Sequence, residues 1–208
     1  RWAALCCFLF SPFILDYLVA ARGYSLALGF LMTALLADPR TLRGCILIST
    51  TIGLCFASNF SFAFACAAAM GALFLRSWTE SGIARGKLLA AYIVPPALAV
   101  WLIAAPSILN FPRQELWYGS ESLLQAFASI LDSQGHVAVY LAVALTAITW
   151  TRRRISRDTA LFGGVFLAAV ALHFAAFHAL GLLYPKDRTG IFFVPLAFGA
   201  LGALAATA

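Results

Sequence analysis

Residues 45–75, CILISTTIGLCFASNFSFAFACAAAMGALFL, decide how this chain folds. The stretch contains no charged residue, which is typical of a segment inside a membrane. It is too long for one ordinary helical crossing, which takes about 20 residues, and short for two. The polar sequence SNFS at 58–61 divides it. We therefore expect two short helices that form a hairpin.

Positive charge flanks this hairpin on both sides. Arg40 and Arg43 precede it, and Arg76, Arg85 and Lys87 follow it. Loops rich in Lys and Arg stay on the cytoplasmic side of a membrane, so both loops are expected there. Two loops on one side require an even number of crossings between them, which favours the hairpin over a single helix.

Composition places the whole chain in a bilayer. The 208 residues are 63% hydrophobic and 11% charged, whereas a water-soluble domain has roughly 25% charged residues. We predict an all-α polytopic transmembrane helix bundle that forms one integral-membrane domain over residues 1–208. The eight expected membrane segments are 2–20, 24–37, 44–57, 60–75, 88–105, 136–151, 160–183 and 190–207.

This topology divides the positive charges unevenly. Of the 14 Lys and Arg residues, all but four fall on the cytoplasmic side. The four on the outer side are Arg22, Arg113, Lys186 and Arg188. The net charge of +6 is therefore a topology signal, and we expect membrane lipids and no nucleic acid among the partners.

The ends of the sequence suggest a piece of a longer protein. Arg1 stands directly before one apolar run, and the last residues lie inside another. We expect an internal fragment of a longer polytopic protein, inactive by itself.

The long outer loop, 106–135, contains a helical pattern. Ser120 is expected to cap a short helix over about 120–133. Apolar residues then recur at helical spacing. They are Leu123, Leu124, Phe127, Ile130 and Leu131. The pattern predicts an amphipathic helix that lies at the outer membrane interface.

Arg22 stands at a membrane boundary on the side that normally avoids cations. Its guanidinium can hold a phosphate through two parallel hydrogen bonds, and the Tyr24 hydroxyl can add a third. Alternatively, Arg22 reaches the outer headgroups or pairs with Asp16.

A second outer cluster is Lys186, Asp187 and Arg188, which Pro185 and Gly190 bracket as a turn between helices. Two cations beside one acid can bind a phosphate or a diphosphate, or can form a solvated loop. His178, near the outer end of its helix, is expected within reach of this turn as a hydrogen-bond partner.

We expect no metal centre and no cofactor, although a divalent metal is left open. His173 and His178 are five residues apart, whereas a helical metal pair needs a spacing of three or four. His173 is expected in the core, bonded between helices. The cysteines are expected to be small buried hydrophobic residues. They are Cys6, Cys7, Cys45, Cys55 and Cys66.

Two stretches resemble a known family. PFILDY at 12–17 followed by ARGYSL at 21–26 resembles bacterial membrane glycosyltransferases of the GT-C superfamily. These are related to the protein mannosyltransferases, the lipid A aminoarabinose transferases and the Rgt-type transferases. YPKDR at 184–188, running into FFVPL at 192–196, is similar to the outer turn of that family, and RQELWYG at 113–119 also looks family-like.

The resemblance implies a reaction and a site. Such enzymes move a sugar from a polyprenyl-phosphate donor to a lipid, glycan or protein acceptor at the outer face of the bacterial inner membrane. Arg22 and Arg188 would hold the donor phosphate as it leaves, assisted by Lys186. Two departures stand out: Ala21 occupies a position where the family often has Glu or Gln, and the family's catalytic acid would lie upstream of this chain.

The alternatives are a non-catalytic membrane scaffold, which would not need cations on the outer side, and, ahead of it, a polytopic transporter or lipid flippase. A transporter or flippase predicts charged or broken helices near the bilayer midplane in two matching halves. Here the sequence has no mid-helix charges and no corresponding halves, and the one midspan break is Pro95-Pro96.

Overall fold

A computed structural model describes residues 23–105, 109, 119–133, 156–185 and 187–205. Within these ranges the chain is helical, and the only strand-like pairing is the isolated bridge between Ser120 and Tyr184. The contacts divide the chain into two compact units, 22–116 and 1–21 with 117–208. The all-α prediction is confirmed for the described residues, and the single-domain expectation stays a prediction.

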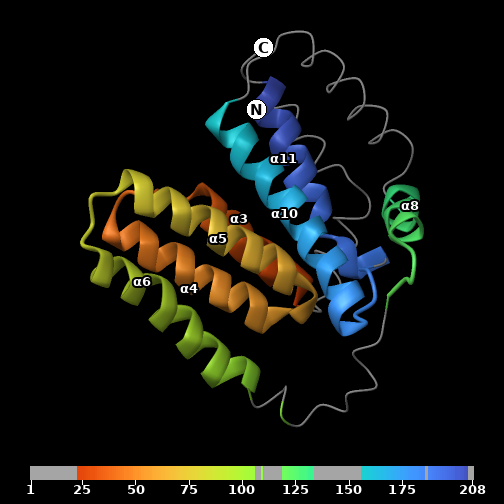
Figure 1. The fold of residues 1–208 in the computed structure, drawn as a ribbon, viewed down its shortest axis with the longest axis horizontal. Helices are drawn as coiled ribbons and strands as arrows, with labels where there is room; N and C mark the ends of the chain where they lie inside the picture. The colour runs from red at the N-terminus through yellow and green to blue at the C-terminus, as the bar shows by residue number, and fades with distance from the viewer. Residues whose placement is uncertain (1–22, 106–108, 110–118, 134–155, 186, 206–208) are drawn as a thin grey trace. The chain divides into compact units, whose positions relative to one another are not determined.

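The described residues of the first unit form the α-helices α3 (Tyr24–Leu36), α4 (Leu42–Ser58), α5 (Ala63–Glu80) and α6 (Arg85–Ala99). α4 is the central helix and contacts the other three. Successive helices reverse direction, so that α4, α5 and α6 run back and forth (Figure 1). The largest fully buried side chains of this unit fill the space around α4. They are Leu31, Ile48, Phe62, Leu73 and Leu88.

The predicted hairpin is confirmed. α4 ends at Ser58, and the 3-10 turn η1 (Phe60–Phe62) leads into α5. The side chain of Asn59 accepts the N–H of Ser61 at 3.0 Å, which satisfies a donor at the start of this turn. At the other end of α4, Thr41 accepts the N–H of Gly44 at 3.0 Å as its N-cap.

Hydroxyl groups join α4, α5 and α6 near one end. The hydroxyls of Ser77 and Tyr92 lie 2.7 Å apart, and the Cys45 sulfur lies 3.5 Å from the Ser77 hydroxyl. All three side chains are buried. In apolar surroundings such bonds favour one register of the three helices over its neighbours.

The Pro95-Pro96 pair lies inside α6, which continues as the π-helix η2 (Val100–Ala104). Pro95 has no N–H, so the carbonyl of Ala91 lacks its normal partner within the helix. The Ser49 hydroxyl of α4 donates to this oxygen at 2.5 Å. The pair is therefore accommodated by a bond from the neighbouring helix.

We expect Ser49→Ala to destabilise the first unit by about 1 kcal/mol, because the Ala91 carbonyl would be left without a partner. Among the described residues, the Ser58 hydroxyl donates to the Leu54 carbonyl of its own helix alone, at 2.7 Å, so Ser58→Ala is the matched control. Thermal unfolding of both variants in one detergent measures the difference. Equal melting temperatures would contradict the role assigned to Ser49.

The second unit contains α8 (Leu123–Ser133), α10 (Arg157–Leu180), the 3-10 turn η4 (Asp187–Gly190) and α11 (Phe193–Ala205). α10 packs along α11. Val165 of α10 and Ile191, Phe192 and Leu196 are fully buried between them. Aromatic rings add to this core: Phe166 lies 5.4 Å from Phe193 between ring centroids.

Three helical segments are long and apolar enough to cross a membrane: Phe60–Glu80, Arg85–Ile103 and Arg157–Leu180. α3, α4 and the part of α11 over Phe193–Ala203 are apolar but shorter. Six of the eight expected segments thus coincide with apolar helices, whereas 2–20 and 136–151 lie outside the described residues. The number of crossings stays a prediction.

α6 exposes an apolar face that would be unusual in water. Ile93, Leu98 and Trp101 expose 59%, 51% and 70% of their surface. A helix with such side chains facing outward is suited to contact with lipid tails.

Candidate functional site

α3 begins at a backbone position that only glycine adopts readily. Gly23 has φ 78° and precedes the first helical residue, Tyr24. A Cβ atom on Gly23 would meet the Ser58 carbonyl oxygen at 2.4 Å. Gly23, at the start of α3, therefore lies in close contact with the end of α4, beside the Asn59 turn.

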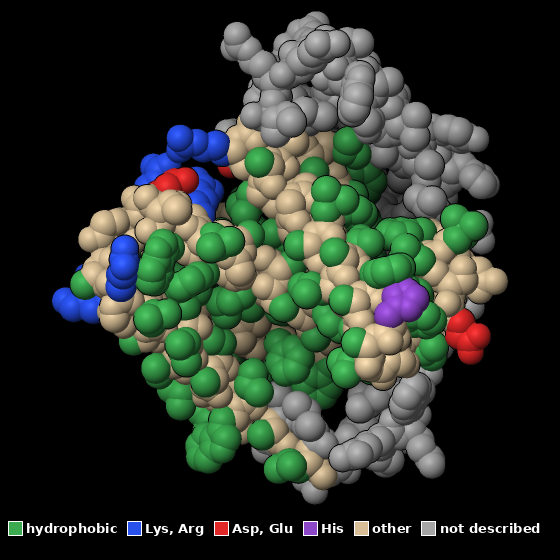
Figure 2. Space-filling model, viewed as in Figure 1, with side chains coloured by type: hydrophobic (Ala, Val, Ile, Leu, Met, Phe, Trp, Pro, Cys, Tyr) green, Lys and Arg blue, Asp and Glu red, His purple; other side chains and the backbone are tan. Residues whose placement is uncertain are grey.

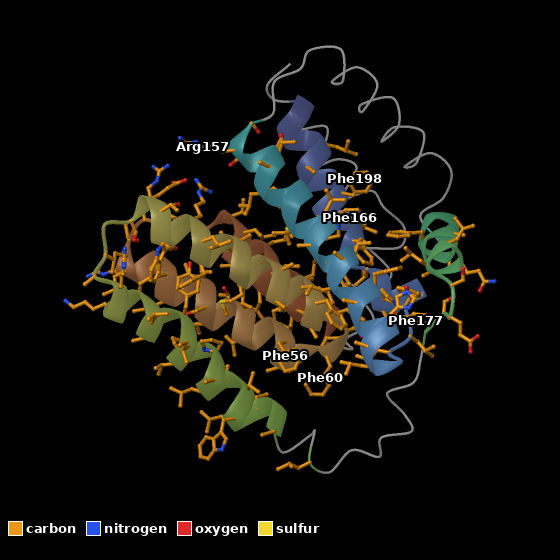
Figure 3. The ribbon with its side chains drawn as sticks, viewed as in Figure 1. Phe56, Phe60, Arg157, Phe166, Phe177 and Phe198 are labelled. Carbon is orange, nitrogen blue, oxygen red and sulfur yellow. The ribbon has the colours of Figure 1, made fainter. Side chains whose placement is uncertain are left out.

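This entry point lies at the end of the first unit opposite to the 38–43 and 76–87 loops, because α3 and α4 run antiparallel (Figure 1). The expectation that Tyr24 and Asn59 share one end while the two basic loops share the other is confirmed. Phe56 and Phe60, with ring centroids 5.3 Å apart, mark the Asn59 end (Figure 3).

Of the two candidate residues here, Arg22 lies outside the described residues. Tyr24 is buried, with 8% of its surface exposed, and packs in the core of the first unit. The hydrogen bond expected from the Tyr24 hydroxyl to a phosphate stays a prediction.

In the second unit, the segment before α8 pairs with the turn that follows α10. Ser120 and Tyr184 exchange two backbone hydrogen bonds, each 2.9 Å long. Gly119 makes this approach possible, since a Cβ there would lie 2.5 Å from the Tyr184 oxygen. The pairing joins Ser120, within the long 106–135 loop, to Tyr184, two residues before the predicted Lys186–Arg188 turn. No sequence pattern indicated this connection.

The helix predicted at 120–133 is confirmed as α8, but Ser120 does not cap it. The Ser122 hydroxyl accepts the N–H of Gln125 at 3.5 Å, so Ser122 holds the capping position. Ser120 instead pairs through its backbone with Tyr184, and that pairing moves the helix start to Leu123. The position of α8 at a membrane interface stays a prediction.

The second cationic cluster lies in and beside the turn η4. Asp187 and Arg188 are its first two residues, their side chains lie outside the description, and so does all of Lys186. α8 contacts η4. The backbone that carries Arg188 is therefore held against α8 on one side and anchored through Tyr184 on the other.

Aromatic rings surround the base of this turn. Tyr184 stacks on Phe177 of α10 at a centroid distance of 4.6 Å. His178 is exposed, and its described contacts are with the rings of Phe174 at 4.4 Å and Phe177 at 5.3 Å. Its expected hydrogen bond to the Asp187–Arg188 turn stays a prediction.

His173 is a core residue, as expected. It is 6% exposed and stacks on Phe192, and its Nδ1 lies 2.9 Å from the Ala169 carbonyl of the same helix. That described bond lies within α10, whereas we expected one between helices.

A small cavity of about 10 Å³ lies beside His173, with room for about one water molecule. Its other lining residues are Leu123, Ala126, Phe127, Val170, Pro185 and Phe193. It is too small for a sugar or a lipid.

Metal ligands do not gather in the part of the chain that the structure describes: no group of three His, Cys, Asp or Glu side chains is placed to hold an ion. Cys45, Cys55 and Cys66 are buried free thiols, which agrees with their expected role as small hydrophobic residues. Cys6 and Cys7 lie outside the described residues.

The opposite end of the first unit carries an ion-pair cluster. Arg40 Nε lies 3.2 Å and Arg76 Nε 3.4 Å from oxygens of the Glu80 carboxylate. The guanidinium of Arg85 lies 4.9 Å from the ring centroid of Trp78. From the sequence, these cations are predicted only to mark the cytoplasmic side of the membrane. The spacing of Arg76 and Glu80, four residues on one helix, was the available sign of an ion pair.

Comparisons with protein-family models, with characterised proteins and with solved structures find no match to this chain. The described residues are helical, and three helical segments are long and apolar enough to cross a membrane.

Proposed function

We propose that this chain is part of a polytopic bacterial inner-membrane glycosyltransferase of the GT-C type. It would transfer a sugar from a polyprenyl-phosphate donor to a lipid, glycan or protein acceptor at the periplasmic face. In this reaction the bond between the anomeric carbon and the phosphate oxygen breaks, a bond to the oxygen of an acceptor hydroxyl forms, and that hydroxyl gives up its proton to a base. The leaving polyprenyl phosphate takes up the negative charge that a cation can stabilise.

The observation that carries the proposal is the separation of polar ends in the first unit. The Arg40–Arg76–Glu80 cluster lies at one end, and Gly23, directly after Arg22, lies at the other, against Ser58. Arg22 is thus adjacent in sequence to the end that lacks the basic loops. A cation there is suited to an anionic ligand at the outer face rather than to the cytoplasmic surface.

The turn in the second unit adds support. Arg188 belongs to a short 3-10 turn whose backbone is fixed by the Ser120–Tyr184 pairing and by α8. A fixed backbone removes one part of the freedom that an arginine loses when it binds a phosphate, which favours electrostatic stabilisation by that arginine.

Native mass spectrometry of the full-length protein purified from membranes tests this function. We expect a bound polyprenyl-phosphate lipid in the wild type and its loss in Arg22→Ala and in Arg188→Ala. Arg157→Ala removes a cation at the N-terminus of α10, away from the η4 end of that helix, and is the control that should keep the lipid. No such lipid in any sample, or equal retention in all four, would overturn the proposal.

A further inference from the structure

The end of the first unit that carries Arg40 and Arg76 is strongly positive. The segments 38–43 and 76–87 contain the cations Arg40, Arg43, Arg76, Arg85 and Lys87 and the acids Asp38 and Glu80. In Figure 2, blue and red side chains lie together at this end of α4, α5 and α6, and green side chains cover the length of these helices. Two carboxylates cannot neutralise five cations, so the end keeps a positive excess.

Arg40, between α3 and α4, and Arg76, on α5, share one carboxylate. Arg40 and Arg76 both approach Glu80 through Nε, so these ion pairs leave the terminal guanidinium nitrogens of both residues for other partners. The side chains of Arg40, Arg76 and Glu80 are 51%, 24% and 29% exposed, within reach of a ligand. A carboxylate that holds two guanidinium groups side by side prepares them to bind one anion together.

A tryptophan, Trp78, lies on α5 between Arg76 and Glu80. Trp78 is 40% exposed and carries the Arg85 guanidinium over its ring. Trp and Arg are frequent where the headgroups of a bilayer meet its apolar core.

Exposed apolar side chains begin within about one turn of these cations. They are Leu42, Ile46 and Leu47 on α4, Leu75 on α5, and Leu89 and Ile93 on α6. A soluble phosphate would contact only the cations. A phospholipid has a charged headgroup directly joined to apolar tails, and so matches cations that lie directly beside exposed apolar side chains. The combination favours an amphiphilic anion.

We propose that this end binds the headgroup phosphate of an anionic membrane phospholipid, held by Arg40 and Arg76 and attracted by Arg43, Arg85 and Lys87. The inference rests on the membrane setting proposed above and is independent of the transferase reaction. A lipid here would fix the depth at which α4, α5 and α6 sit in the membrane, because the loops would be tied to the headgroups.

The test compares lipid binding by the purified full-length protein in detergent, with phosphatidylglycerol and phosphatidylcholine as probes in native mass spectrometry. We expect phosphatidylglycerol to bind preferentially, and the double variant Arg40→Gln, Arg76→Gln to weaken its binding about tenfold. Arg157→Gln, outside the cluster, should bind as the wild type does. Equal binding of both lipids, or equal phosphatidylglycerol binding by the double variant and the wild type, would overturn the proposal.

Glu80→Gln keeps the test meaningful if the double variant folds poorly. One oxygen of Glu80 lies within 3.4 Å of both Nε atoms, so the amide oxygen of Gln can still hold the two guanidinium groups side by side while the negative charge is removed. Phosphatidylglycerol binding should therefore strengthen, a gain that misfolding does not produce. Weaker binding by a folded Glu80→Gln protein would contradict the proposal. Displacement of the lipid by inorganic phosphate at constant ionic strength would show a site for free phosphate and overturn the assignment to a lipid. Since these variants leave Arg22 and Arg188 intact, their outcome is separate from that of the proposed function.

Discussion

Gly53→Ala is expected to destabilise the first unit by about 1–3 kcal/mol, although it adds a single methyl group. A Cβ on Gly53 would lie 2.6 Å from the Cα of Pro96 and 3.1 Å from the Cβ of Ala99. The first of these is a backbone atom, so the contact can be relieved only by moving α6 away from α4. That movement would also lengthen the bond from Ser49 to the Ala91 carbonyl, which Pro95 leaves without a partner in its own helix.

Gly71→Ala is the matched control, because it makes the same chemical change in the neighbouring helix α5. Among the described residues, no atom apart from the neighbouring backbone of α5 lies within 4 Å of a Cβ on Gly71. Alanine is the better helix former by about 1 kcal/mol in water, so this variant should be unchanged or more stable. Thermal unfolding in the same detergent compares the stability of the Gly53→Ala and Gly71→Ala proteins. A Gly53→Ala protein as stable as Gly71→Ala would mean that α4 and α6 do not approach each other as described.

The sequence predicted features that depend on local chemistry. The SNFS break was visible because Asn and Ser interrupt an apolar run, and Asn59 indeed ends α4. The meeting of the two basic loops followed from charge alone, because two cationic loops favour one side of a membrane. Their partner, Glu80, was not anticipated, since the contact between Arg40 and Glu80 joins residues 40 positions apart.

Two helices begin three residues before the predicted membrane segments, for an identifiable reason. The predicted segments began where hydrophobicity begins, at 88 and 160, whereas α6 begins at Arg85 and α10 at Arg157. Charged residues can form the first turn of a helix outside the apolar region, and Ser156 caps α10 by accepting the N–H of Thr159 at 3.0 Å. A hydropathy pattern does not report such caps.

Close backbone approaches were beyond prediction. Gly53 lies against Pro96 and Gly119 against Tyr184, and in each case the two residues are far apart in the sequence. The residues on either side of these glycines carry no sign of the distant contact. The candidate donor site was predicted from cations at a membrane boundary. Arg22 and Lys186 lie outside the described residues, and so does the side chain of Arg188, so the site stays a prediction.

Gly119→Ala should have the second large effect, in the second unit. Its Cβ would lie 2.5 Å from the Tyr184 oxygen, which accepts the Ser120 N–H, and 2.6 Å from the Leu183 Cβ. The two backbone bonds between Ser120 and Tyr184 would lengthen or break. At about 1 kcal/mol each, with added strain, we expect a loss of roughly 2–3 kcal/mol. Gly164→Ala in α10, where a Cβ would have open space, is the control that should keep full stability.

This variant also separates the position of the turn from its charge. The Ser120–Tyr184 pairing anchors the backbone that leads into η4, so Gly119→Ala should shift the turn that carries Arg188 without removing any charged residue. Under the proposed function, a folded Gly119→Ala protein should lose bound polyprenyl phosphate in native mass spectrometry, as Arg188→Ala does. If it is destabilised but keeps the lipid, binding does not depend on the anchored turn, and the donor phosphate must be held elsewhere. If its melting temperature equals that of Gly164→Ala, the pairing itself contributes nothing, and the anchor assigned to this turn is wrong.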